Sequence, residues 1–168
     1  PGHATLPDVV VFGVIGWDFR IQRPQQLALE LARRGHRLFY VTPSFVDARA
    51  PGYRIARIDE QLPLYEVRLH APERVSIYAG APEEDVTRHL LASMRELLHD
   101  VAIGPNVALV DHPGWVDVAA AMPRTTLVYD CMDNHHGFAQ AGSRLPDDER
   151  RLVAAADAVI VTSDLLQT

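Results

Sequence analysis

Lysine is absent from this chain of 168 residues, and all 16 of its basic residues are arginine. Without lysine, the chain can form neither a Schiff base nor the phosphate contact of a Walker loop. Its single cysteine, Cys131, excludes an intrachain disulfide and any multi-cysteine metal site, which fits a reducing compartment. We therefore expect a cytoplasmic protein.

Long hydrophobic runs are also absent. The longest apolar stretch, residues 9–17, is far shorter than the roughly 20 residues of a membrane-spanning helix, and no signal-peptide pattern precedes it. The net charge of -6 is spread over mixed acids and bases, which argues against nucleic acid as a partner. Peripheral contact with a membrane stays open. The first seven residues lack an initiating methionine, and we expect them to be an expression remnant or a disordered N-terminus.

What the chain does contain is an alternation of strand and helix patterns. Buried strands are predicted at 9–14, 36–43, 106–111, 125–130 and 157–163. Weaker strand signals lie at 64–70 and 74–80, and in this middle part of the chain we expect excursions or a small hairpin. Helices are predicted from Pro24 to Gly35, over 82–100, from Trp115 to Met122 and from Pro146 onward, and Ser163 resembles the N-cap of another. This alternation predicts an α/β fold with a Rossmann-like, doubly wound, mostly parallel sheet in one domain over residues 8–168.

The connection after the first strand reads GVIGWDFRIQRP and carries unusual residues for its place. It lacks the third glycine and the downstream acid of a dinucleotide-binding loop, so we expect no nicotinamide cofactor. Gly16 allows close approach of a ligand, Trp17 can stack on a sugar ring or simply close the loop, and Arg20 and Arg23 lie near a helix N-terminus that favours anions. Alternatively, either arginine pairs with a neighbouring acid.

A second group of polar residues follows the later strands. Ligands of doubly wound sheets bind at the carboxyl ends of the strands, where these side chains are expected to gather. The group can supply a general base, hydroxyl-binding groups or helix caps, and since its spacing matches no metal motif we predict no metal. Its members are Asp111, His112, Trp115, Asp130, Asp133, His135 and His136.

Together these segments resemble a known family. The stretch GWDFRIQRPQQLALELARRGHRLFYVTPSF resembles the opening of bacterial glycosyltransferases of the GT-B fold. The stretches LVYDCMDNHHGF and ERRLVAAADAVIVTSDLL resemble the later part of the same N-terminal domain. The resemblance implies that this chain is the acceptor-side half of a GT-B fold, that a C-terminal domain binding the donor is missing, and that the piece alone is inactive.

The resemblance also implies roles for particular residues. The loop from Gly13 to Arg20 would face the donor diphosphate and the acceptor, with Arg20 and Arg23 neutralising phosphate charge. Asp130, Asp133 or His135 would orient or deprotonate the acceptor hydroxyl. The remaining candidates, Gly16, Trp17, Asp111, His112, Trp115 and His136, would bind substrate.

The implied reaction transfers a sugar from a nucleotide sugar, which is a substrate, to a cell-surface glycan or lipid-linked acceptor, in the cytoplasm or at the inner face of the membrane. No other cofactor is expected. Two alternatives stay open: half of a sugar-nucleotide epimerase, and a stand-alone binding module of flavodoxin-like shape.

Overall fold

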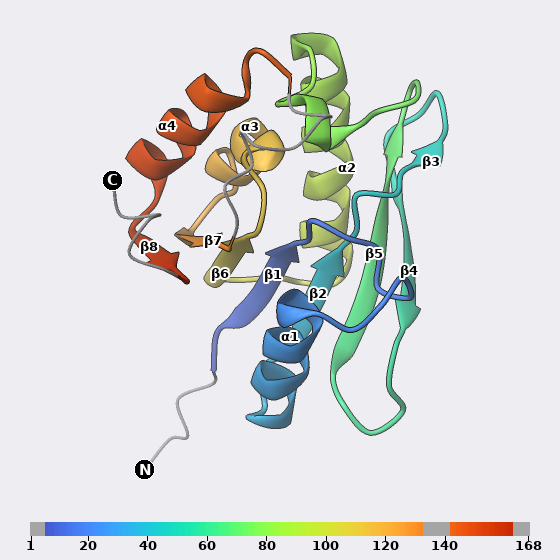
Figure 1. Ribbon diagram of the computed structural model, residues 1–168. Coiled ribbons are helices and arrows are strands. Elements are labelled where there is room, and N and C mark those ends of the chain that lie inside the picture. The colour runs from blue at the N-terminus through green and yellow to red at the C-terminus, as the bar shows by residue number, and fades with distance from the viewer. Residues whose placement is uncertain (1–5, 133–141, 163–168) are drawn as a thin grey trace.

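The computed structural model describes residues 6–132 and 142–162, arranged as one sheet with helices on both faces (Figure 1). The strands are β1 (Asp8–Phe12), β2 (Leu38–Val41), β3 (Val46–Asp47), β4 (Tyr53–Arg57), β5 (Leu64–Ala71), β6 (Asn106–Val110), β7 (Thr125–Cys131) and β8 (Ala158–Val161). The α-helices are α1 (Arg23–Arg33), α2 (Glu84–Asp100), α3 (Val116–Ala120) and α4 (Leu145–Ala155). Two 3₁₀ turns, η1 (Ile77–Ala79) and η2 (Pro113–Trp115), complete the described elements.

The strand order identifies the fold. The sheet runs β3-β5-β2-β1-β6-β7-β8, and the path from β5 to β8 is parallel throughout. Counting only the parallel strands of that path along the chain gives the order 3-2-1-4-5-6, which is that of the Rossmann fold and differs from the flavodoxin-like order. The predicted Rossmann-like, mostly parallel sheet is confirmed. The flavodoxin-like shape of one alternative is wrong. Here β1 lies between β2 and β6, the second and fourth parallel strands along the chain, whereas the flavodoxin-like order places the first strand between the second and the third.

Two hydrophobic clusters cover the two faces of the sheet. On one face, α1 packs through Ala28 and Ala32 against Val9 and Val11 of β1. On the other, α2, α3 and α4 pack over Phe12 and the outer strands. This division follows from the chain path, since right-handed crossovers on either side of β1 place their helices on opposite faces.

Local sequence accounts for the helix boundaries. Pro24 lies in the first turn of α1, where its missing N–H costs nothing, and Gly35 ends the segment with φ of 98°. Glu84 and Asp85 lie in the first turn of α2, where their negative charges interact favourably with the positive end of the helix dipole. The apolar residues along one side of α2 are buried, and Leu91 beside them is partly buried; the buried ones are Val86, Leu90, Met94, Leu97 and Leu98.

The middle of the chain departs from a plain Rossmann fold. Between β2 and β5 the chain contains the short strand β3 and the antiparallel strand β4. A small hairpin, one of the two possibilities expected here, thus forms from β4 and β5, although no strand was predicted at β4. The predicted strand over 74–80 is wrong. Only η1 forms there, because Ile77 lies in the core while Gly80, with φ of 119°, turns the chain away from the sheet.

In the part of the chain that the structure describes, no helix has both the length and the apolar character needed to span a membrane.

Candidate functional site

The switch point of this sheet lies between β1 and β6, where the crossovers change direction. In open α/β sheets the crevice at this point, outside the carboxyl ends of the strands, is the usual ligand site. The β1–α1 loop (residues 13–22) and the turn that begins at Asp111 leave the sheet here, side by side, since Phe12 pairs with Val110. The two polar groups predicted from the sequence therefore start at one edge of the sheet.

The carbonyl groups of the β1–α1 loop are held by side chains from four other elements. The indole of Trp115 in η2 donates to Gly13 O, the hydroxyl of Tyr78 in η1 to Val14 O, and that of Tyr40 in β2 to Ile15 O, at 3.0, 2.6 and 3.0 Å. The fourth donor is the fully buried Gln25 of α1, whose Nε2 contacts Gly16 O, Trp17 O and, at 2.8 Å, Arg20 O. The loop therefore has a defined backbone shape.

The amide groups of the same loop are arranged differently. Among the described residues, the N–H groups of Ile15, Gly16, Trp17 and Asp18 have no hydrogen-bond partner. Since a trans peptide places C=O and the next N–H on opposite sides, holding the carbonyls inward turns these amides the other way. A row of unpaired amides beside a helix N-terminus is suited to an anionic group.

The two glycines of the loop have different reasons to be glycine. A Cβ on Gly13 would lie 2.6 Å from the buried ring of Tyr40, so packing inside the protein explains this residue. A Cβ on Gly16 would meet nothing within 4 Å in the part of the chain that the structure describes. The space beside Gly16 is therefore open, and its role in letting a ligand approach stays a prediction.

Arg23, Asp111 and Asp130 converge at the carboxyl ends of β6 and β7. Val110 pairs with Tyr129, so Asp111, directly after β6, and Asp130, next to the last residue of β7, occupy equivalent positions. Arg23, at the start of α1, holds the fully buried Asp130 with two hydrogen bonds, Nε to Oδ2 at 2.9 Å and Nη2 to Oδ1 at 3.0 Å. This pairing, which was one of the alternatives for the arginine, raises the pKa of Arg23.

Asp111 is the residue whose burial the fold does not explain. It is fully buried, and among the described residues neither of its carboxyl oxygens has a hydrogen-bond partner of normal geometry. Burial raises the pKa of Asp111 well above its ordinary value, and the charge of Asp130 raises it further. Arg23 and the nearby N–H of Val14 lower it by less. Asp111 therefore favours the protonated form, which can donate a hydrogen bond.

Arg20 and Trp17 occupy the outer part of the loop. Arg20 is exposed, and its guanidinium lies 5.5 Å from the ring centroid of Phe19, which is also exposed. Trp17 is partly buried and meets Tyr40 edge-on at 5.1 Å between centroids, which is the loop-closing role considered for it. The structure thus brings Arg23, not Arg20, to the two aspartates.

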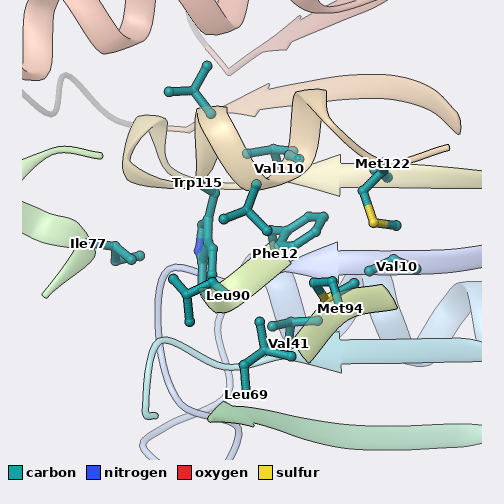
Figure 2. Close-up of a cluster of buried hydrophobic side chains, with 14 of the residues drawn as sticks. Val10, Phe12, Val41, Leu69, Ile77, Leu90, Met94, Val110, Trp115 and Met122 are labelled. Carbon is teal, nitrogen blue, oxygen red and sulfur yellow. The ribbon is translucent and has the colours of Figure 1, made fainter. Parts of the chain in front are cut away.

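His112 and Trp115 are core residues. Trp115 is fully buried between Phe12 and Phe45, and Figure 2 shows it inside the hydrophobic cluster. The Nδ1 atom of His112, which is 3% exposed, accepts a hydrogen bond from Gly114 N. Both side chains therefore have structural roles, and their contacts with substrate stay a prediction.

The remaining candidates, Asp133, His135 and His136, lie outside the described residues. Within residues 6–132 and 142–162, no three His, Cys, Asp or Glu side chains gather as a metal site would require. Sequence reasoning missed Tyr40, Tyr78 and Gln25, which shape the loop. Gln25 carried a detectable signal, since Gln22 and Gln25 have the spacing of a capping box, which the structure contains. No pattern in the sequence marks the two tyrosines.

No family model matches the chain, and no curated protein matches it.

Proposed function

We propose that this chain is the acceptor-side, N-terminal half of a GT-B glycosyltransferase that transfers a sugar from a nucleotide sugar to a glycan or lipid-linked acceptor. The observation that carries the proposal is the row of unpaired amides from Ile15 to Asp18, at the switch point of a Rossmann-ordered sheet and beside the Arg23–Asp130 pair. A diphosphate leaving group needs donors and positive charge of this kind. The sequence resemblance supplies the reaction class.

Arg23 can bind a phosphate group while it stays paired with Asp130. Its Nε and Nη2 atoms bind Asp130, whereas Nη1 has no partner among the described residues, and the side chain is 41% exposed. Asp130 then orients the guanidinium through a two-point contact, which fixes its plane. In this proposal Asp130 is a positioning residue for Arg23, and the role of base falls to Asp133 or His135, the other two of the three residues that the resemblance implies for it.

Asp111 lies below the exposed part of the site. An acceptor hydroxyl reaches its carboxyl only if the atoms that cover both oxygens move. Its protonation state also acts from a distance, since an ionised Asp111 places a second negative charge near Arg23. The cytoplasmic location and a peripheral contact with the inner face of the membrane belong to the same proposal.

The test uses the protein expressed from its whole reading frame, incubated with a panel of nucleotide sugars and with glycan and lipid-linked acceptors. We expect transfer from at least one donor, and a loss of about tenfold or more in kcat/KM for Arg23→Gln. The control is Arg34→Gln, at the exposed C-cap of α1. Absence of both donor binding and transfer across the panel overturns the proposal. A product formed from the donor alone favours the epimerase alternative.

A further inference from the structure

Tyr78 connects the two loops that form the switch point. It belongs to η1, which follows β5, yet its hydroxyl donates to Val14 O in the β1–α1 loop at 2.6 Å. Its ring meets the ring of His112 edge-on, with 5.7 Å between centroids and 82° between planes. His112 directly follows Asp111, so one half-buried side chain contacts both sides of the crevice.

The segment that carries Tyr78 is itself firmly placed. Ile77 is fully buried, and Gly114 packs so closely against Ile77 O that a Cβ at residue 114 would collide with it. A Cβ on Gly142 would collide with Ala79 O in the same way. Because these clashes involve backbone atoms on both sides, η1 has little freedom to shift, and the hydroxyl of Tyr78 is held at a fixed point.

The peptide group between Val14 and Ile15 links this contact to the proposed ligand site. The C=O of Val14 and the N–H of Ile15 belong to one planar trans peptide, so they point in opposite directions. Holding Val14 O toward Tyr78 therefore directs the N–H of Ile15, which is unpaired among the described residues, away from η1. Tyr40 acts on Ile15 O and the N–H of Gly16 in the same way.

We infer that Tyr78 is a positioning residue, which orients the Ile15 amide toward an anionic ligand through its hydrogen bond to Val14 O. The inference rests on the proposed function for the identity of the ligand, and it adds a residue that the sequence motifs do not contain. Tyr78 itself touches the loop from within the protein and needs no contact with the ligand.

The experiment compares Tyr78→Phe with a matched control, Tyr53→Phe. Each variant loses one tyrosine hydroxyl and one hydrogen bond, but the Tyr53 hydroxyl donates to Asp100 at 3.1 Å, at the far end of α2. Inorganic pyrophosphate is the probe for affinity, measured by titration calorimetry, and the amide signal and hydrogen exchange of Ile15 are followed by NMR in the free protein.

We expect Tyr78→Phe to shift the Ile15 signal, to speed its exchange, and to weaken pyrophosphate binding about tenfold, as befits one misdirected hydrogen bond. Tyr53→Phe should leave all three unchanged, with a melting temperature close to that of Tyr78→Phe. An unchanged Ile15 signal and unchanged affinity in Tyr78→Phe overturn the inference, and so does exchange that speeds equally throughout the sheet. If the wild type does not bind pyrophosphate while the Ile15 signal still shifts, the anion site of the proposed function fails and the positioning by Tyr78 stands.

Discussion

Replacement of Asp111 by asparagine tests the reasoning about the switch point most directly. Asparagine keeps the shape of the side chain but cannot ionise. Burial raises the folded-state pKa of Asp111 above the ordinary value of 3.8, so between these two pKa values the folded chain binds more protons than the unfolded chain. The free energy of unfolding of the wild type therefore decreases as pH rises through that interval, and Asp111→Asn lacks this decrease.

The size of the effect follows from the linkage between proton binding and folding. One proton difference changes the free energy of unfolding by about 1.4 kcal/mol per pH unit. The wild type therefore loses stability at up to this rate over every pH unit that separates 3.8 from the raised pKa of Asp111.

The assay is urea unfolding followed by tryptophan fluorescence at intervals between about pH 4.5 and 7.5. The buried Trp115 reports loss of the core, and the exposed Asp47 provides the control variant Asp47→Asn. We expect the free energy of unfolding of Asp111→Asn, relative to that of the wild type, to increase steadily as pH rises. The free energy of unfolding of Asp47→Asn should follow that of the wild type. Parallel curves for the wild type and Asp111→Asn would refute the argument that the fold holds this carboxyl protonated.

Two further substitutions probe the packing and the ion pair at the same edge. Gly114→Ala should lower the free energy of unfolding by about 1–3 kcal/mol in urea titrations, because the added methyl collides with Ile77 O, a backbone atom that cannot turn aside. Arg23→Met should cost about 1–3 kcal/mol in the same assay, since it leaves the fully buried carboxylate of Asp130 without its partner.

Each of these substitutions has a control in the same chain. Gly104→Ala adds a methyl where nothing lies within 4 Å, and Arg34→Met removes an exposed pair with Glu30 in the same helix as Arg23. The free energy of unfolding of both control variants should stay within about 0.5 kcal/mol of the wild-type value. Equal losses in test and control variants would contradict the assigned contacts.

The arrangement of strands and helices was predictable because it depends on patterns within short segments. Parallel strands buried on both faces read as continuous apolar runs, as in VVVF of β1, and the crossover rule then places their ends at one edge. For the same reason, the convergence of Asp111 and Asp130 followed from their positions at the carboxyl ends of two strands.

What could not be predicted depends on contacts between distant segments. The stretch around Ile77 has the residues of a strand, but Gly114 and the turn at Gly80 hold it as η1. Trp115 has the chemistry of a sugar-binding residue, yet its N–H is satisfied by Gly13 O within the core. Arg20 and Arg23 look equivalent in the sequence, and only the start of α1 decides which of them faces Asp130.

The four donors that hold the β1–α1 loop have a consequence for protein engineering. They come from α1, β2, η1 and η2, whose sequence positions extend from Gln25 to Trp115. A transplant of residues 13–22 into another Rossmann domain would carry the amides but leave these donors behind, and the grafted carbonyls would turn to water. The shape of this loop is a property of the whole domain, and it can be moved only together with the residues that surround it.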